Sequence, residues 1–312
     1  MILEHVSCRI CGADDSKCLF ETNDALTRSG TVFTIVQCNG CGMVYLNPRP
    51  KLEDISFYYP QEFNAYQFEI KSIDNTGVKA RLLASIVRSS ASDRVKAVKT
   101  LLKNPSASVL DIGCGKGSFL SVLKETTAMK GIGFDFDPAS IEYGRTVLNL
   151  DVVDGSSEAL EQWDEKFDLI TMWHFLEHSY DPLTILRQCR RLLADEGVLV
   201  VEVPNADSLE NRCFKSKSYL YDVPRHLLNF SPTTLCRLLE AAGFKVQQTK
   251  FQTFAGGWLG SVQQLLSGGR IYARMQEHVL ALLVLSLLCY PIDRLAGAIG
   301  LGSIMRITAR KA

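Results

Sequence analysis

The sequence predicts an α/β fold built around a parallel, doubly wound sheet. From residue 108 onward, short apolar strands alternate with helical segments, and the turns between them are short. The strand expected at Val198–Val203 is rich in valine and apolar over most of its length, as a strand covered by helices on both faces would be. Repeated strand–helix units of this kind place successive strands parallel to one another in one sheet.

The individual elements follow from apolar runs and from residues that typically begin or end helices. Asp181 is a good N-cap and Pro182 suits the first turn, so a helix should begin there and end before Gly197. The expected strands are 109–112, 131–134, 167–171 and 198–203. The other expected helices are 81–103, 118–124, 138–148 and one that runs from Pro232 to Gly243.

Composition and charge narrow the functional classes. The 312 residues include 34 Lys+Arg and 34 Asp+Glu, so the net charge is zero. Nucleic-acid binders usually carry a basic surplus, and we therefore expect no nucleic-acid partner. The N-terminus shows no basic region followed by an apolar one, so we expect no secretory signal and a cytoplasmic location. Thiols stay reduced there, and paired cysteines then suggest a metal site.

Two Cys-x-x-Cys pairs, each followed by glycine, occur within the first fifty residues. Four thiolates from two such pairs can surround Zn²⁺ tetrahedrally, and they leave no open position for catalysis. The sequence therefore predicts a zinc-ribbon module with a structural Zn²⁺, and unliganded buried cysteines are the alternative. The predicted ligands are Cys8, Cys11, Cys38 and Cys41.

The chain divides into four expected parts, with an unusually apolar one at the end. These are a zinc module at 1–50, a helical connector at 51–105, a catalytic domain at 106–255 and a helical tail at 256–312. Residues 279–292 carry no charge and are too few to span a bilayer as a straight helix. The tail is therefore either a buried or subunit-packing helix, in a homo-oligomer, or a peripheral membrane contact through 279–307 on the inner face of the membrane.

A glycine-rich turn with two nearby carboxylates predicts the ligand. Gly113, Gly115 and Gly117 follow the first strand, and their spacing differs from the dinucleotide fingerprint, which wants its third glycine one place later. Asp111 precedes the turn and suits an ammonium group better than phosphates. Asp135 ends the second strand, where a carboxylate can accept both hydroxyls of a ribose. S-adenosylmethionine has the ribose and the amino-acid end that these residues imply.

Five successive motifs carry a family resemblance. VLDIGCGKGSF, GFDFDP, FDLI, LEH-x-x-DP and RLLADEGVLVVEVPN resemble, in this order, the motifs of class I S-adenosylmethionine-dependent methyltransferases over about residues 105–250. The resemblance implies a Rossmann-like, seven-stranded, mostly parallel sheet. The CxxCG pairs ahead of it are similar to the zinc modules of sugar C-methyltransferases and of methyltransferases in polysaccharide biosynthesis.

The resemblance also implies roles for individual residues. Asp111 and the glycines would hold the methionine end, Asp135 the ribose, and Ser156 and Ser157 would lie near the adenine. Met172 and Trp173 would lie beside the sulfonium. The full expected set of cofactor contacts is Asp111, Gly113, Gly115, Gly117, Asp135, Phe136, Ser156, Ser157, Met172 and Trp173.

Methyl transfer often needs a base, and three histidines are the candidates: His226, His178 and His174. His226 follows the fifth strand, where loops form the ligand crevice of this fold. Its surroundings are similar to the Glu-His segment of sugar C-methyltransferases, with Arg225 in place of the glutamate. That arginine could instead bind an anionic acceptor. A structural loop histidine is the alternative for His226.

His174, Glu177 and His178 are spaced to share one helical face. H-x-x-E-H also matches a metallohydrolase signature, but that function explains neither the glycine turn nor Asp135. Ubiquinone-type O-methyltransferases carry an acid, Glu and His at similar places, sometimes proposed to hold a divalent cation, and His174 stands where the first acid would be. A packed, hydrogen-bonded turn is the simplest interpretation.

The expected function is methyl transfer from S-adenosylmethionine to a small-molecule acceptor, a sugar or a lipid-linked intermediate. An rRNA base methyltransferase is an alternative, because some of these enzymes also carry an N-terminal zinc module. The neutral charge and the lack of an Asn/Asp-Pro-Pro-aromatic stretch after the fourth strand disfavour it. A non-catalytic scaffold that retains the fold is the third possibility, and the intact glycine turn argues against it.

Overall fold

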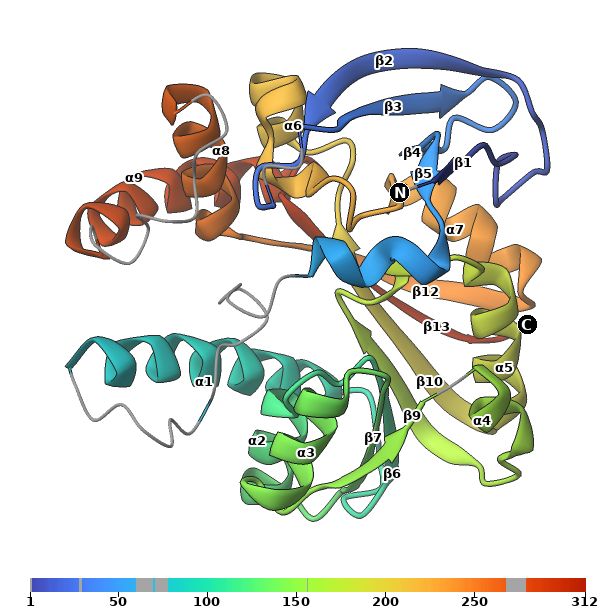
Figure 1. The fold of residues 1–312 in the computed structure, drawn as a ribbon. Coiled ribbons are helices and arrows are strands. Elements are labelled where there is room, and N and C mark those ends of the chain that lie inside the picture. The colour runs from blue at the N-terminus through green and yellow to red at the C-terminus, as the bar shows by residue number, and fades with distance from the viewer. Residues whose placement is uncertain (1, 28–29, 60–69, 71–77, 156, 268–278) are drawn as a thin grey trace.

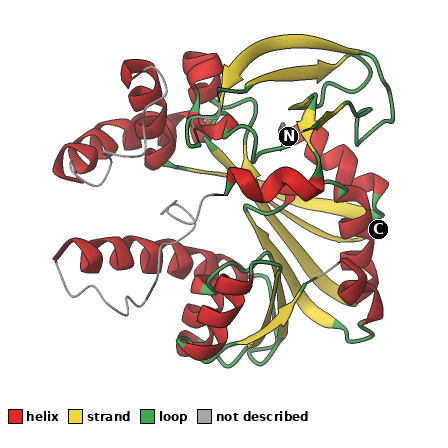
Figure 2. Ribbon diagram, viewed as in Figure 1, coloured by secondary structure: helices red, strands yellow, loops and turns green. Residues whose placement is uncertain are grey.

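The structure is a computed structural model that describes residues 2–27, 30–59, 70, 78–155, 157–267 and 279–312. Its described strands form one sheet of seven strands, one of four and one of two. Figure 1 shows the large sheet at the centre, with α1, α2 and α3 on one face and α4, α5 and α7 on the other. Figure 2 shows the same alternation of helices and strands.

The seven-stranded sheet has the strand order β12-β13-β10-β9-β6-β7-β8. Its strands are β6 (Ser108–Ile112), β7 (Lys130–Asp135), β8 (Asp151–Asp154), β9 (Phe167–Trp173), β10 (Leu193–Pro204), β12 (Phe244–Gln252) and β13 (Ile304–Lys311). The pairs from β10 to β8 are parallel, and β13 is antiparallel to both of its neighbours. This sheet confirms the predicted Rossmann-like, mostly parallel α/β fold.

The helices that cover the sheet begin where their capping residues predict. Asp137 accepts a hydrogen bond from the Ser140 amide, and Asp181 accepts one from the Thr184 amide. The helices are α1 (Val78–Lys99), α2 (Ser118–Thr126), α3 (Pro138–Thr146), α4 (Ser157–Gln162), α5 (Pro182–Leu192) and α7 (Pro232–Ala241). α5 ends at Leu192, earlier than the expected end next to Gly197, because Leu193 already pairs with Phe167 of β9 and begins β10.

The core lies on both faces of the sheet, as β10 illustrates. Val198 and Val200 pack with the residues of α1, α2 and α3, whereas Leu199, Val201 and Val203 pack with those of α5 and α7. All five side chains are buried. A strand buried on both faces needs a continuous apolar run, which is why its sequence alone indicated its place in the sheet.

The N-terminal module is hydrogen-bonded to the rest of the chain. It contains β1 (Leu3–Glu4), β2 (Ser16–Asn23), β3 (Val32–Cys38), β4 (Val44–Leu46) and β5 (Arg49–Pro50). Its four-stranded sheet is completed by β11 (Leu228–Asn229), where Leu228 pairs with Tyr45. The strand that completes the module therefore comes from the loop that follows His226. The short helical turn η1 (Leu52–Tyr58) connects the module to the domain.

The C-terminal segment contains the expected helices and one unexpected strand. The helices are α8 (Ala255–Ser267) and α9 (Val279–Ala298), and no helix in the described part of the chain is long and apolar enough to cross a membrane. Residues 304–311 form β13, although the whole segment was expected to be helical. Four of its apolar side chains are buried in the sheet, which favours the strand. The domain boundaries themselves stay predictions.

A buried carboxyl pair joins α9 to the sheet and to α6 (Leu209–Phe214). The Ser303 hydroxyl oxygen lies 2.9 Å from both Glu210 Oε2 and Asp293 Oδ1, but it has one proton to donate. A protonated Glu210 that donates to Ser303, which then donates to Asp293, satisfies all three groups. Burial, with the nearby Asp293 carboxylate, raises the pKa of Glu210 to about 8, consistent with this arrangement.

Glu210 therefore predicts a pH-dependent stability. Its folded pKa is above the usual 4.5, so the folded state keeps a proton that the unfolded state has lost. The contribution of Glu210 to the free energy of unfolding should be largest below pH 4.5 and fall by up to about 1.4 kcal/mol per pH unit as the pH rises to about 8. Urea unfolding from pH 5 to 9 should show a smaller decrease of stability with rising pH in Glu210→Gln than in the wild type, because the variant lacks the contribution of Glu210. Equal slopes in both proteins would contradict the assignment.

Candidate functional site

The glycine turn connects β6 to α2 and combines tight packing with one open position. Gly113, Gly115 and Gly117 all have positive φ, which disfavours side chains. A Cβ atom would lie 2.3 Å from the Phe175 ring at Gly113 and 2.5 Å from Leu150 at Gly117. At Gly115 a Cβ atom would meet nothing within 4 Å. The backbone around Gly115 therefore borders open space, where a ligand can approach closely.

Asp111 brings an unsatisfied carboxylate oxygen to the base of this turn. The side chain is buried, and its Oδ1 accepts a hydrogen bond of 2.6 Å from the Thr171 hydroxyl. Oδ2 has no hydrogen-bond partner among the described residues. Burial raises the pKa of Asp111 to about 7. A buried carboxylate with one free oxygen fits an ammonium group, which would supply the missing hydrogen bond and favour the charged form.

Asp135 lies at the end of β7, directly beside the turn. It accepts hydrogen bonds from the backbone amides of Gly115 (2.7 Å) and Asp137 (2.9 Å), one on each carboxylate oxygen. Burial raises its pKa. Each oxygen keeps a second lone pair, so the carboxylate can still accept two ribose hydroxyls. Phe136 is 59% exposed, with its ring centre 5.8 Å from that of Phe175, and offers an apolar face beside it.

Two of the remaining expected cofactor contacts, Met172 and Trp173, are buried. Met172 is fully buried in the core, and Trp173 packs between Phe119 and the guanidinium groups of Arg94 and Arg306. Their expected contact with the sulfonium stays a prediction. Ser156 lies outside the described residues. Ser157 begins α4, and the surroundings of its side chain are likewise outside the described part.

Two of the three candidate histidines lie together with a buried glutamate. Glu177, His178 and His226 each offer a ligand atom, and these atoms all lie within 4.8 Å of one another. His226 Nδ1 is 2.8 Å from the Leu220 carbonyl, and His178 Nδ1 is 2.9 Å from the Arg225 carbonyl. A carbonyl only accepts, so each Nδ1 carries a proton and each neutral ring keeps its lone pair on Nε2.

The electrostatics of this cluster favour neutral His178 and an ionised glutamate. Burial and the neighbouring His226 lower the pKa of His178 to about 4. Glu177 is 1% exposed, and neither carboxylate oxygen has a hydrogen-bond partner among the described residues. Burial opposes its ionisation, but the close approach of His174 Nδ1, 3.3 Å from Oε1, and the neighbouring imidazoles outweigh it and lower the pKa of Glu177. Such a set can remove a proton from an acceptor or bind a divalent cation.

His174 approaches the same glutamate. The prediction that the two residues share one face of a helix is wrong. The φ of His174 is +54°, its amide donates to the Glu202 carbonyl, and only residues 176–178 form a helical turn, η2. Its Nδ1 lies 3.3 Å from Glu177 Oε1 and its Nε2 3.5 Å from Glu202 Oε1. The backbone bond to β10 therefore prevents the expected α-helical geometry.

Arg225 is part of the scaffold, so the expectation that it binds an anionic acceptor is wrong in this structure. The side chain is 1% exposed, and its guanidinium forms ion pairs with Asp24 (3.1 Å) and Asp222 (2.6 Å). It also donates to the Tyr58 carbonyl. Because Asp24 belongs to the N-terminal module, these bonds connect that module to the loop whose carbonyl orients His178.

Sequence reasoning missed several partners in this site. Asp24 and Tyr59, whose hydroxyl lies 3.0 Å from His178 Nδ1, are distant in sequence and belong to no motif. Thr171 lies within an expected strand, and the structure pairs it with Asp111 in the register of β6 and β9. A threonine in the strand next to the one that carries Asp111 is a natural hydrogen-bond partner for that carboxylate.

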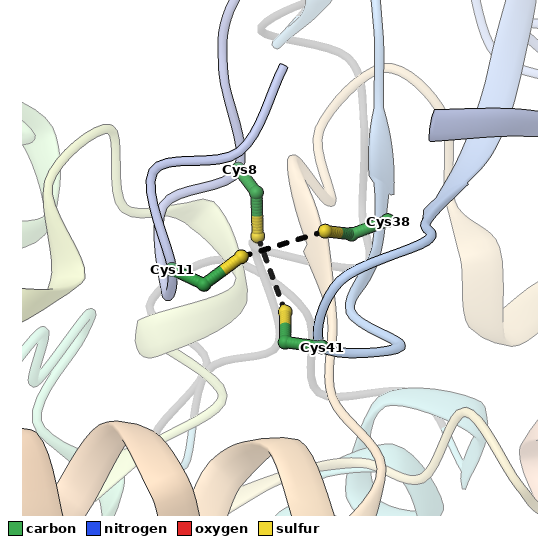
Figure 3. Close-up of side chains that lie close together, drawn as sticks. All are labelled: Cys8, Cys11, Cys38 and Cys41. Atoms are coloured by element: carbon green, nitrogen blue, oxygen red, sulfur yellow. Dashed lines mark hydrogen bonds between the residues drawn. The ribbon is translucent and has the colours of Figure 1, made fainter. Parts of the chain in front are cut away.

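The four predicted metal ligands lie together at the tip of the N-terminal module. Figure 3 shows their sulfur atoms pointing toward one another. The Sγ atoms of Cys8 and Cys41 are 3.4 Å apart, and those of Cys11 and Cys38 are 3.5 Å apart. Sulfurs around a tetrahedral zinc are separated by about 3.8 Å, and all four ligand atoms here lie within 4.8 Å of one another, so the cluster is compact enough to surround Zn²⁺. Although burial opposes it, backbone hydrogen bonds at Cys41 and Gly40 lower the pKa of Cys38 to about 7.

Known proteins share this domain. Residues 83–249 match a family described as a methyltransferase domain. A probable S-adenosylmethionine-dependent methyltransferase of Mycolicibacterium smegmatis is 28% identical over 172 residues, which cover 55% of this chain and 64% of that protein. A ubiquinone biosynthesis O-methyltransferase of Histophilus somni is 34% identical over 137 residues, covering 40% and 53%. The chain thus spans between half and two thirds of the length of these relatives.

A solved structure agrees with the sequence comparisons. The crystal structure of a SAM-dependent methyltransferase from Archaeoglobus fulgidus superposes with a TM-score of 0.50 at 25% identity, over 72% of this chain and 94% of that one. The family match covers more than half of the chain and includes the glycine turn, Asp111 and Asp135. This protein therefore belongs to the S-adenosylmethionine-dependent methyltransferases.

Proposed function

We propose that the protein transfers a methyl group from S-adenosylmethionine to a small-molecule acceptor, a sugar or a lipid-linked intermediate. The observation that carries the cofactor part is the pair Asp111 and Asp135 on either side of the open position at Gly115. One buried oxygen of Asp111 has no partner among the residues that the structure describes, and it suits the ammonium group. Asp135 is held by two backbone amides and suits the ribose hydroxyls.

His226 is the base in this proposal. S-adenosylmethionine supplies a methyl group already activated by positive sulfur, so the protein must orient the acceptor and remove its proton. The acceptor proton passes to Nε2 of His226, whose Nδ1–H is held by the Leu220 carbonyl. The Glu177 carboxylate next to it stabilises the imidazolium that forms, and His178 remains neutral. The methyl group moves to the acceptor, and S-adenosylhomocysteine leaves.

The zinc module has a structural role in this proposal. Four thiolates complete a tetrahedral zinc site, so no position remains for substrate. Gly12 and Gly42 follow the second cysteine of each pair with positive φ, and their amides donate to the carbonyls of Cys8 and Cys38. These tight turns arrange the sulfur atoms. The module then supports the acceptor loop through β11 and through the ion pair between Asp24 and Arg225.

Calorimetric titration with S-adenosylmethionine tests the proposal. We expect micromolar binding that Asp135→Ala weakens at least about tenfold, because each tenfold loss corresponds to about 1.4 kcal/mol of ribose contacts. Asp151→Ala, an exposed carboxylate at the start of the neighbouring strand β8, is the matched control and should bind like the wild type. A folded protein that binds no S-adenosylmethionine would favour the non-catalytic scaffold instead.

The acceptor is tested separately. Nucleotide sugars and lipid-linked glycans should be screened first, with formation of S-adenosylhomocysteine as the readout. Tight RNA binding that weakens steeply with salt would favour the rRNA alternative, because phosphate contacts release counterions. The equal numbers of acidic and basic residues make that outcome the less expected one.

A further inference from the structure

Helix α9 exposes apolar side chains and buries a charged one. In its described second half, the buried positions are Cys289, Asp293 and Ala296. Asp293 is fully buried and accepts hydrogen bonds from the amides of Phe254 and Ser303. In the described part of α9 and just beyond its end, the exposed large apolar residues are Leu288 (63%), Tyr290 (44%), Ile292 (46%), Leu295 (72%) and Ile299 (74%). This is the reverse of the pattern that a helix on a water-facing surface normally shows.

Helix α8 adds to this exposed apolar area. Leu265 is 60% and Leu266 81% exposed at its C-terminal end. α8 packs against α9, and Figure 1 shows the two helices next to one another at one side of the molecule, beyond α6. We call the six side chains the α8–α9 surface: Leu265, Leu266, Leu288, Ile292, Leu295 and Ile299. Exposed apolar residues gathered on neighbouring helices are typical of a surface that binds a membrane or another protein.

The charges around the α8–α9 surface distinguish between these partners. α8 contains no charged residue, and α9 contains only the buried Asp293 and the exposed Arg294. Arg212 and Lys215 are exposed on α6 and on η3 (Lys215–Lys217), both of which contact α8. Within the described chain, none of these three cations forms an ion pair with a carboxylate. An apolar surface with unpaired cations beside it matches the acyl chains and anionic phosphates of a bilayer surface.

The α8–α9 surface is also connected to the candidate acceptor site. The Tyr219 amide donates to the Ser261 hydroxyl of α8 at 2.8 Å. Tyr219 begins the turn η4 (Tyr219–Tyr221), and the carbonyl of Leu220 in that turn accepts from His226 Nδ1. Two hydrogen bonds thus link α8 to the proposed base. A bilayer bound at α8 would lie near the loop that receives the acceptor.

We propose that the α8–α9 surface docks the protein on an anionic membrane surface and turns its acceptor loop toward a lipid-linked substrate. The docking stands on the exposed apolar residues and the neighbouring cations alone. The orientation toward a lipid-linked substrate rests on the proposed function. Since no described helix can cross a bilayer, the two helices would lie in the interface.

Flotation with lipid vesicles tests the docking on the full-length, zinc-loaded protein. The wild type should float with phosphatidylglycerol vesicles and bind phosphatidylcholine vesicles severalfold more weakly. The double variant Leu295→Glu/Ile299→Glu should reduce binding to phosphatidylglycerol vesicles at least tenfold, because it places two charges in the apolar contact. The matched control Leu52→Glu/Ile86→Glu changes two residues of similar type that are 67% and 50% exposed elsewhere, and it should bind like the wild type.

Affinity for S-adenosylmethionine separates this inference from the proposed function. Both double variants should bind S-adenosylmethionine within twofold of the wild type, which also shows that they fold. A wild type that binds S-adenosylmethionine but does not float, or a Leu295→Glu/Ile299→Glu variant that floats as well as the control, would overturn the docking alone. Light scattering that finds a dimer which this variant dissociates, without any flotation, would overturn it in favour of a second copy of the chain.

Discussion

Replacing His226 with glutamine is expected to lower kcat by about two to three orders of magnitude, the usual contribution of a general base. Glutamine can keep the hydrogen bond to the Leu220 carbonyl but cannot take a proton from the acceptor. The acidic limb of the pH–rate profile should therefore disappear in the variant. Initial rates of S-adenosylhomocysteine formation across pH 5 to 9 measure both effects.

One further variant gives this experiment its control. His5→Gln removes an exposed histidine of the N-terminal module that precedes the first metal ligand, and it should leave kcat and the pH profile unchanged. Affinity for S-adenosylmethionine should stay within twofold in both variants, because neither residue contacts the glycine turn in this proposal. If His226→Gln turned over the acceptor at a rate within twofold of the wild type, His226 would be a structural loop residue, and Glu177 would become the next candidate base.

Those features of the fold that depend on local geometry could be predicted from the sequence. The glycine turn needs positive φ at Gly113 and Gly117, and this requirement is visible in any sequence that satisfies it. Helix caps such as Asp181 act within three residues, and the apolar run of β10 reflects burial on both faces. The metal site could also be predicted from the four cysteines. Each pair forms its own tight turn, and tetrahedral coordination by a metal then determines how the two pairs face one another.

Contacts between distant segments could not be predicted in the same way. His226 joins Glu177 and His178 because its loop lies against η2, where the Leu227 amide donates to the Glu177 carbonyl, and nothing in the spacing of the three residues indicates this. Arg225 was interpreted as a substrate contact because its partner Asp24 lies 201 residues earlier. The strand β13 follows a long helical stretch, and its place between β10 and β12 depends on a return of the chain that no local signal shows.

Removing zinc is expected to abolish acceptor turnover while S-adenosylmethionine binding persists. Structural zinc sites contribute on the order of 10 kcal/mol to the folding of small modules, so Cys38→Ser or a strong chelator should unfold the ribbon. The loss should reach the acceptor loop, because β4 pairs with β11 and Asp24 holds Arg225. The glycine turn and Asp135 lie at the edge of the seven-stranded sheet, and the core on the α1–α3 face of this sheet contains no residue of the module, although the core on the other face is shared with it.

Metal analysis and two binding assays make this prediction decisive. The wild type should contain one zinc per chain, and Cys38→Ser should contain none. Cys18→Ser, an exposed cysteine of β2 outside the cluster, should keep the metal and full activity. A purified wild type that is active without zinc would contradict the structural role. Loss of S-adenosylmethionine binding together with the metal would instead mean that the ribbon and the seven-stranded sheet fold as one cooperative unit, so that the ion pair between Asp24 and Arg225 stabilises both.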